Sequence, residues 1–343
     1  MTKKTTIYDI AKKLNITAAT VSRALNKNPK ISDATKELVL KTATEMNYEQ
    51  NKLAQALKNG KSYNVGVIVS RIDSNFFASI IRGIEEELFN HGYHVIICQT
   101  NNNEKMEAEN INTLLNAQVD GILMSISNIN IDKNIMFKKL LNKKIPLLFF
   151  DRKKSIPGIS SITIDDFSAG YKATQHLIDE GCKRISHLSV DRNFEIFRDR
   201  FLGYKQALSD NNIPFDESLV IETKSNIEAG KEATKKLLKL QNPPDAIFSS
   251  SDFSALGAIQ ELKSQGIKIP QEVCVVGFSN EPFTKFMELS ISSIDQSPVE
   301  MGKTTARVFI QQIKNKEKHV EQKVVLEPKL IIRKSSSKQN PSK

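Results

Sequence analysis

The chain has 343 residues, of which 39% are hydrophobic, and a formal net charge of +10 at pH 7. This length allows two or three packed units, and no apolar run approaches the roughly 18 to 20 residues of a membrane-spanning helix, so we expect a soluble protein with no membrane partner. The N-terminus lacks the apolar stretch of about 7 to 15 residues of a secretory signal, which predicts a cytoplasmic location. Three separated cysteines and five histidines argue against a disulfide framework and a zinc site, so we expect no metal and no cofactor.

The positive charge is concentrated at the N-terminal end. Residues 1–62 contain 12 Lys and Arg against 5 Asp and Glu, a net +7, whereas residues 63–343 contain 37 against 34, a net +3. Clustered positive charge on a small unit is typical of proteins that bind polyanions, because neutralising phosphates releases condensed counterions. Charge alone also fits a solvated lysine-rich face.

Three short helices are predicted in this basic unit. Each begins after a residue that can cap it, namely Thr6, Thr17 and Ser32, and the third helix runs to about residue 46. Asn15 tolerates a left-handed backbone and fits a tight turn between the first two helices. The side chains expected to face inward are Ile7, Ile10, Ala11, Leu14, Val21, Ala24, Leu25, Leu38, Val39, Thr42 and Met46. Two short helices that cross steeply and are closed by a third form a helix-turn-helix unit.

The second helix is the expected reader of DNA. If it enters the major groove, the exposed residues near its start face base edges and phosphates. Ala18 and Ala19 offer only methyl groups, so Arg23 is the long donor that can bind guanine O6 and N7, although it could instead be a solvated surface side chain. The DNA-contacting residues expected in this unit are Thr6, Tyr8, Thr17, Ala18, Ala19, Thr20, Ser22, Arg23, Asn26, Ser32 and Thr35.

A helical segment of about two turns follows, from Asn51 to Lys58, directly before a β-branched strand. Two turns are too short to be stable alone in water. The segment is therefore either a plain linker or a helix that forms only with a partner.

Three stretches, "TIYDIAKKLNITAATVSRALN", "ISDATKELVLKTATEMNY" and "NKLAQALKNGKSYNVGVIV", resemble the N-terminal region of the LacI/GalR family of bacterial transcription regulators. The similarity continues to "LIIRKSS" and so covers about residues 5–336. The resemblance implies a hinge helix that forms when two subunits bind operator DNA, with Asn51 at its start, Ala54 between the paired helices and Leu57 inserted into the minor groove. Gln50 stands where the family often has proline, which loosens the entry to the hinge.

After residue 62, short apolar strands alternate with amphipathic helices. The alternation occurs twice, because "RGIEEEL" and "LGYKQAL" occupy matching places, as do "VDGILMS" and "PDAIFSS". Such a pattern predicts two similar α/β lobes, each with a parallel sheet. The resemblance implies the type I fold of periplasmic sugar-binding proteins, with chain segments exchanged between the lobes near the C-terminus. The expected fold class is thus an all-α helix-turn-helix domain followed by a two-lobed, periplasmic-binding-protein-like α/β effector domain.

The expected domain boundaries follow from these patterns. They are residues 1–50 for the DNA-binding domain, 51–62 for the hinge helix and linker, 63–336 for the effector-binding and dimerisation domain, and 337–343 for a disordered tail. Lobe one is expected at about 63–162 plus 294–325, and lobe two at about 163–293 plus 326–336. The polar tail has no heptads, so no tetramerisation helix is expected.

Small ligands bind at the carboxyl ends of strands in open α/β sheets. Strand ends and the family pattern together give an expected effector-binding set of Ser70, Ser74, Phe76, Phe77, Asp151, Arg200, Ser251, Ser279 and Gln296. The resemblance implies that Arg200 grips the ligand, although it could instead form an ion pair between the lobes. Phe76 and Phe77 could stack on a sugar ring or pack in the core.

Two departures from the family pattern bear on the ligand. Ser279 stands where many sugar-binding relatives have an aspartate, and Ser225 stands where many have an aromatic residue. Loss of a carboxylate, with Arg200 and nearby Arg198 retained, favours an anionic ligand, since arginine forks match phosphate and carboxylate groups.

The predicted function is that of a repressor of the LacI/GalR type. It would act as a homodimer on pseudo-palindromic double-stranded operator DNA, be nucleoid-associated when bound, and respond to a sugar, acidic sugar or sugar phosphate. Whether the ligand releases or recruits the operator is open. An enzyme is disfavoured because P-loop, G-x-S-x-G, H-E-x-x-H and G-x-G-x-x-G motifs are missing. The alternative is a soluble small-molecule-binding protein without sequence-specific DNA regulation.

Overall fold

A computed structural model describes residues 5–49, 60–127, 134–143, 145–315 and 320–338. The chain divides into two units, residues 1–62 and residues 63–343. Among the helices in these described ranges, none combines the length and apolar character needed to cross a membrane.

The smaller unit consists of three helices whose ends match the capping signals of the sequence. They are α1 (Ile7–Leu14), α2 (Ala18–Leu25) and α3 (Asp33–Glu45). The hydroxyls of Thr6, Thr17 and Ser32 accept hydrogen bonds from the backbone amides three residues later, at 3.4, 3.1 and 3.3 Å. Asn15 has a φ of 53° in the turn after α1. The predicted helices, caps and turn are therefore confirmed.

All three helices contribute to the core of this unit. Its buried hydrophobic residues are Ile10, Ala11, Val21, Ala24, Val39 and Ala43. The prediction that Leu38 faces inward is wrong, because the buried stripe of α3 runs through Val39, Thr42 and Ala43 and leaves the Leu38 side chain 51% exposed.

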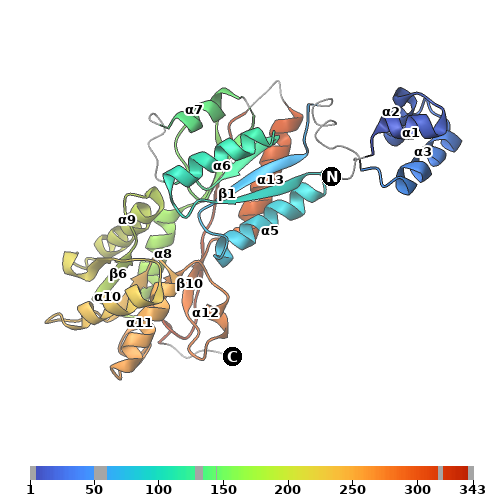
Figure 1. The fold of residues 1–343 in the computed structure, drawn as a ribbon. Helices are drawn as coiled ribbons and strands as arrows, with labels where there is room; N and C mark the ends of the chain where they lie inside the picture. Colours follow the sequence, from blue (N-terminus) through green and yellow to red (C-terminus); the bar gives the residue numbers. More distant parts are fainter. Residues whose placement is uncertain (1–4, 50–59, 128–133, 144, 316–319, 339–343) are drawn as a thin grey trace. The chain divides into compact units, whose positions relative to one another are not determined.

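The larger unit has two lobes, each built on a six-stranded sheet with helices on both faces (Figure 1). The first sheet has the strand order β11-β5-β4-β3-β1-β2, and all its neighbouring strands are parallel. Its strands are β1 (Asn64–Val69), β2 (His94–Gln99), β3 (Gly121–Met124), β4 (Leu147–Phe150), β5 (Ser160–Ile164) and β11 (Lys323–Leu326).

The second sheet repeats this plan with the order β12-β10-β9-β8-β6-β7, and only β12 is antiparallel to its neighbour. Its strands are β6 (Ile185–Ser189), β7 (Val220–Glu222), β8 (Ala246–Ser249), β9 (Cys274–Phe278), β10 (Ser292–Asp295) and β12 (Lys329–Ile331). The predicted pair of α/β lobes is therefore confirmed.

The helices divide between the lobes in the same way. Lobe one holds α5 (Asn75–Phe89), α6 (Glu104–Asn116), α7 (Ile135–Asn142) and α13 (Pro298–Lys314). Lobe two holds α8 (Asp166–Asp179), α9 (Glu195–Asp210), α10 (Ile227–Leu238), α11 (Asp252–Ser264), α12 (Phe283–Phe286) and a 3-10 turn at Glu217–Leu219. Helix α13 comes late in the sequence but packs beside α5 (Figure 1).

The chain crosses between the lobes slightly later than expected. Ile164 and Leu326 pair within the first sheet, and Asp295 pairs within the second. These pairings place residues 164 and 326 in the sheet of lobe one and residue 295 in the sheet of lobe two, one or two residues beyond the approximate boundaries of 162, 325 and 293 expected from the sequence. The tail also begins later than residue 337, since the Lys338 amide donates to Glu180 Oε2 at 2.7 Å. Residues 339–343 lie outside the described residues.

Close contact between helices depends on glycines in both lobes. In lobe one, a Cβ atom on Gly83 of α5 would lie 2.3 Å from a backbone oxygen of α13, and one on Gly302 of α13 would lie 2.1 Å from a backbone oxygen of α5. The same reciprocal arrangement joins α8 to α9 and α10 to α11, through Gly170 with Gly203 and Gly230 with Gly257. Each glycine pair lets two helix backbones approach more closely than any side chain would allow.

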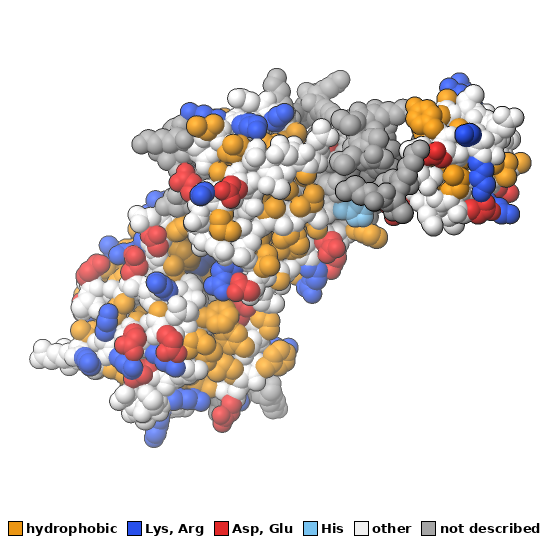
Figure 2. Space-filling view, viewed as in Figure 1, with side chains coloured by type: hydrophobic (Ala, Val, Ile, Leu, Met, Phe, Trp, Pro, Cys, Tyr) orange, Lys and Arg blue, Asp and Glu red, His pale blue; other side chains and the backbone are white. Residues whose placement is uncertain are grey.

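Buried aliphatic and aromatic side chains fill both lobes between the sheets and the helices. On the face shown in Figure 2, Lys and Arg side chains are interspersed with Asp and Glu over this larger unit. The mixed surface agrees with its nearly balanced formal charge.

Candidate functional site

A pocket of about 170 Å³ lies between the two lobes. Lobe one supplies residues that follow β3 and β4, and lobe two supplies the start of α8, the loop after β6 and the start of α9. The lining residues are Ile126, Ser127, Asp151, Arg152, Lys153, Lys154, Thr163, Ile164, Asp166, Asn193, Phe194, Glu195, Ile196, Arg198 and Asp199. Both signs of charge therefore meet at the carboxyl ends of the strands, where ligand sites of open α/β sheets are found.

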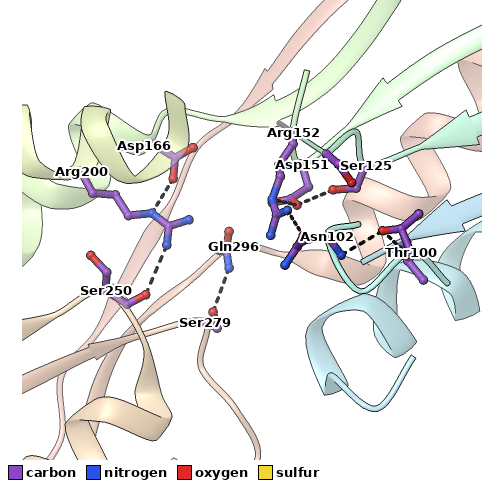
Figure 3. A network of polar contacts seen from close by, with 12 residues as sticks. Thr100, Asn102, Ser125, Asp151, Arg152, Asp166, Arg200, Ser250, Ser279 and Gln296 are labelled. Carbon is purple, nitrogen blue, oxygen red and sulfur yellow. Dashed lines mark hydrogen bonds and ion pairs between the residues drawn. The ribbon is translucent and has the colours of Figure 1, made fainter. Parts of the chain in front are cut away.

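Arg200 is held on the lobe-two side by an ion pair within that lobe. Its Nε donates to Asp166 Oδ1 at 2.7 Å, and its Nη1 donates to the Ser250 carbonyl oxygen at 3.4 Å (Figure 3). Its guanidinium carbon lies 3.5 Å from the ring centroid of Phe278. Arg200 and Asp166 are only 3% and 7% exposed. The alternative expectation, that Arg200 forms an ion pair between the lobes, is wrong, because Asp166 in α8 and Arg200 in α9 belong to the same lobe.

Burial raises the pKa of the Asp166 carboxyl above its ordinary value, against the opposing effect of the Arg200 charge. Burial likewise raises the pKa of Asp151, and the neighbouring Arg152 charge opposes this rise. Two carboxyls with raised pKa values beside one pocket are typical of functional sites.

Arg152 is the arginine that lines the pocket from lobe one. Its Nη1 donates to Asn102 Oδ1 at 2.5 Å, and its Nε lies 3.7 Å from Asp151 Oδ2. Asp151 in turn accepts a hydrogen bond from the Ser125 hydroxyl at 2.8 Å. The Arg152 guanidinium carbon lies 4.8 Å from the ring centroid of Phe194, which belongs to lobe two, so this side chain bridges the lobes.

The other expected effector residues lie in different surroundings. The Gln296 amide donates to Ser279 Oγ at 3.1 Å in the cleft near Arg200 (Figure 3). Phe76 and Phe77 are buried in the hydrophobic core at the start of α5, which matches the core alternative. The remaining three, Ser70 at the end of β1, Ser74 before α5 and Ser251 before α11, do not line the pocket. Of the expected effector set, only Asp151 is among the pocket-lining residues.

Several polar residues of the cleft were not predicted from the sequence. Arg152 and Lys153 come directly after Asp151, and Asp166 follows the strand that leads into lobe two. The signal available was the run "DRKK" after an apolar strand, which places three cations at a strand end. Nothing local marked Asp166 as the partner of Arg200, which lies 34 positions later.

In the smaller unit, the expected DNA-contacting residues form an exposed to half-exposed surface. The Tyr8 side chain is 72% exposed, and Arg23 is also exposed. Thr17 and Thr20 share a hydrogen bond between hydroxyls at 2.9 Å, as do Ser32 and Thr35 at 2.8 Å. The Asn26 amide donates to the Ser22 carbonyl oxygen at 2.7 Å. Ala18 and Ala19 begin α2, and Thr6 caps α1. The expected hinge residues Asn51, Ala54 and Leu57 lie outside the described residues.

Comparison with known proteins covers both units. A family model for bacterial regulatory proteins of the lacI family matches residues 6–51, and one for periplasmic binding proteins and the sugar binding domain of the LacI family matches residues 62–334. The chain is 32% identical to HTH-type transcriptional regulator DegA of Bacillus subtilis (strain 168), over 98% of this chain and 99% of that protein. It is 31% identical to catabolite control protein A of Priestia megaterium, over 97% and 99% of the two chains.

Solved structures give the same picture. The transcriptional regulator CelR in complex with cellobiose is 27% identical, with a TM-score of 0.72 over 97% of this chain and 100% of that one. The lac repressor dimer bound to operator and the anti-inducer ONPF is 23% identical, with a TM-score of 0.87 over 97% and 99% of the chains, which shows the fold. The curated relatives are transcriptional regulators and not enzymes. The chain therefore belongs to the LacI family and is a DNA-binding transcriptional regulator with a helix-turn-helix unit and a two-lobed periplasmic-binding-protein-like domain.

Proposed function

We propose that this regulator changes its affinity for operator DNA when a sugar derivative with a negative charge binds between its lobes. The observation that carries the proposal is the presence of two arginines from different lobes at one cleft (Figure 3): Arg152 lines the pocket and its side chain is 13% exposed, and Arg200 is buried and pairs with the pocket-lining Asp166. A ligand anion between two guanidinium groups would be held from both lobes at once.

The charges around the pocket suit such a ligand. Arg152 and Arg200 each have a carboxylate and an aromatic ring close by, so each guanidinium is oriented before a ligand arrives. Lys153 also lines the pocket and adds positive charge. Asp151 and Glu195 are acceptors that sugar hydroxyls could use. Acidic sugars and sugar phosphates combine an anionic group with hydroxyls, and they are the ligand class we favour over neutral sugars.

Linkage would carry the ligand signal to DNA. A ligand that binds the closed cleft better than the open cleft changes the angle between the lobes, and so the geometry at residues 51–62 in a homodimer. We propose that Asn51, Ala54 and Leu57 form the hinge helix there and that Arg23 reads bases of a pseudo-palindromic operator. Such a protein would work in the cytoplasm, on the nucleoid.

The ligand class is tested by thermal unfolding with glucose, gluconate and glucose 6-phosphate at equal ionic strength. We expect gluconate or glucose 6-phosphate to raise the midpoint by several degrees and glucose to leave it unchanged, because a ligand stabilises the state it binds. Arg152→Met should remove the shift. Arg82→Met is the matched control, since it deletes an exposed cation of α5 away from the pocket. A shift with glucose alone would contradict the anionic ligand.

Operator control is tested by fluorescence anisotropy on genomic fragments over a salt series. We expect sequence-selective binding whose affinity falls steeply as salt rises. Addition of the stabilising ligand should change the affinity, and the direction of the change identifies inducer or corepressor. Leu57→Ala should weaken binding, whereas equal binding to all fragments would contradict sequence-specific regulation.

A further inference from the structure

The turn after β9 holds unusual backbone beside the cleft. Ser279 and Asn280 have φ values of 107° and 50°, in the left-handed region that residues other than glycine rarely adopt. Ser279 Oγ accepts a hydrogen bond from Gln296, so the turn sets the position of a side chain in the cleft (Figure 3). Such a conformation persists only when its surroundings hold it.

Arg333 contacts this turn from the segment that follows β12. Its Nη2 donates to Asn280 Oδ1 at 2.7 Å. Its Nη1 donates to the Ile291 carbonyl oxygen at 2.8 Å and to Thr284 Oγ1 at 3.1 Å. The guanidinium is partly buried and does not line the pocket. Arg333 therefore fixes the Asn280 side chain of this turn without lining the pocket itself.

Asn280 extends the contact toward the other lobe. Its Nδ2 donates to Asp295 Oδ2 at 2.7 Å, and Asp295 Oδ1 accepts a hydrogen bond from the Ser297 amide at 2.6 Å. Ser297 has a φ of 49° and immediately precedes α13, a helix of lobe one. One chain of hydrogen bonds thus joins Arg333, the left-handed turn and the left-handed entry to lobe one.

Asp252 fixes the other side of the turn. Its carboxylate accepts hydrogen bonds from the Glu281 amide at 2.8 Å and from the Ser293 hydroxyl at 2.7 Å. The Asn280 amide donates to the same Ser293 hydroxyl at 2.9 Å. The turn is consequently held between an anchored carboxylate and the Arg333 guanidinium.

We propose that Arg333 is a positioning residue of the effector cleft, which holds the Ser279–Asn280 turn and, through Asp295, the backbone that enters α13. The effect on ligand binding rests on the proposed function of the cleft. The effect on the turn does not, so the two can be measured separately.

The test uses the full-length protein and hydrogen exchange read by mass spectrometry. In Arg333→Met, we expect amides 280, 281 and 297 to exchange about tenfold faster or more, while β9 amides 274–278 keep their rates. Arg333→Lys keeps the charge but loses the fork and should give a smaller effect. Lys334→Met, which alters the exposed neighbour, is the matched control. Unchanged rates at 280, 281 and 297, or a uniform increase across lobe two, would overturn the proposal.

The second measurement is the affinity for glucose 6-phosphate in the same variants. We expect Arg333→Met to weaken it by about tenfold and Lys334→Met to leave it unchanged. Unchanged affinity together with faster exchange would overturn the link between the turn and the cleft. Absence of any response to glucose 6-phosphate in the unmodified protein would contradict that ligand class, and hydrogen exchange would still decide the role of Arg333.

Discussion

The two lobes build the same helix pair with different charges. In both, two helices meet through reciprocal glycines, α5 with α13 in lobe one and α8 with α9 in lobe two. The lobe-one pair is bridged at the surface by Lys303 with Glu86 at 3.0 Å and by Arg307 with Glu87 at 3.1 Å. The lobe-two pair is bridged by the buried Arg200 and Asp166 at 2.7 Å.

This difference indicates which of the two helix pairs contributes to ligand binding. A buried ion pair loses hydration that its attraction only partly restores, so similar stability could be reached with apolar side chains. We infer that lobe two retains Arg200 and Asp166 because Asp166 lines the pocket and Arg200 holds it there, whereas the lobe-one bridges lie at the surface. The following variants test that contrast.

Removal of Asp166 should have the largest effect. Asp166→Ala leaves the Arg200 charge buried without its carboxylate, and we expect the free energy of unfolding to fall by about 3 to 5 kcal/mol. Glu86→Ala, the equivalent deletion in lobe one, should cost under about 1 kcal/mol because its partner is solvated. Urea unfolding of both variants measures the difference. Equal losses would contradict the contrast between the lobes.

The glycine contacts should be equally important for stability in both lobes. A Cβ on Gly203 would lie 2.0 Å from a backbone oxygen of α8, and one on Gly83 would lie 2.3 Å from a backbone oxygen of α13. We expect Gly203→Ala and Gly83→Ala each to cost about 3 kcal/mol, because helix backbones must separate. Only Gly203→Ala should also weaken ligand binding, since it lies one turn from Arg200. A normal ligand response in Gly203→Ala would show that the packing of α8 against α9 does not affect ligand binding.

Much of this architecture could be predicted because its signals are local. The caps at Thr6, Thr17 and Ser32 and the alternation of strands and helices are written in neighbouring residues, and the repeat of "RGIEEEL" as "LGYKQAL" placed Gly83 and Gly203 in matching helices. Leu38 was misassigned because helical periodicity alone does not say which of two adjacent apolar residues faces the core.

The site was harder to predict because its partners are distant in sequence. The family pattern predicts a role in ligand binding for Arg200, but nothing in that pattern pointed to the carboxylate that pairs with it, which comes from another helix. Arg152 follows Asp151 directly, yet its contact with Phe194 exists only once the two lobes come together. Crossing points such as residue 164 depend on pairing between strands far apart in the chain.

A buried histidine gives the lobes different responses to acid. His187 of β6 pairs with Phe248 as Val67 of β1 pairs with Leu123, so the two positions correspond. Burial lowers the pKa of His187 to about 3. The unfolded chain therefore takes up the proton first, and the stability contribution present above about pH 6.5 is lost as pH falls toward 3.

This loss should amount to about 2 kcal/mol at pH 5 relative to pH 7.5. We expect His187→Phe to remove it, which urea unfolding at both pH values measures. Tyr204→Phe alters a ring stacked on His187 without removing the imidazole, so it should shift stability equally at the two pH values. An unchanged acid response in His187→Phe would assign the effect to other groups.

The smallest effect on stability is expected for the ion pair between Lys303 and Glu86 in lobe one. Lys303 and Glu86 are both partly exposed, so a double-mutant cycle with Lys303→Ala and Glu86→Ala should give a coupling of about 0.2 to 1 kcal/mol. The coupling should shrink at about 1 M salt, where the screening length falls to roughly 3 Å. A coupling that persists at high salt would mean that this bridge, like Arg200 with Asp166, is shielded from solvent. The two lobes would then differ in whether the paired charges lie beside the pocket, and not in how strongly solvent screens those charges.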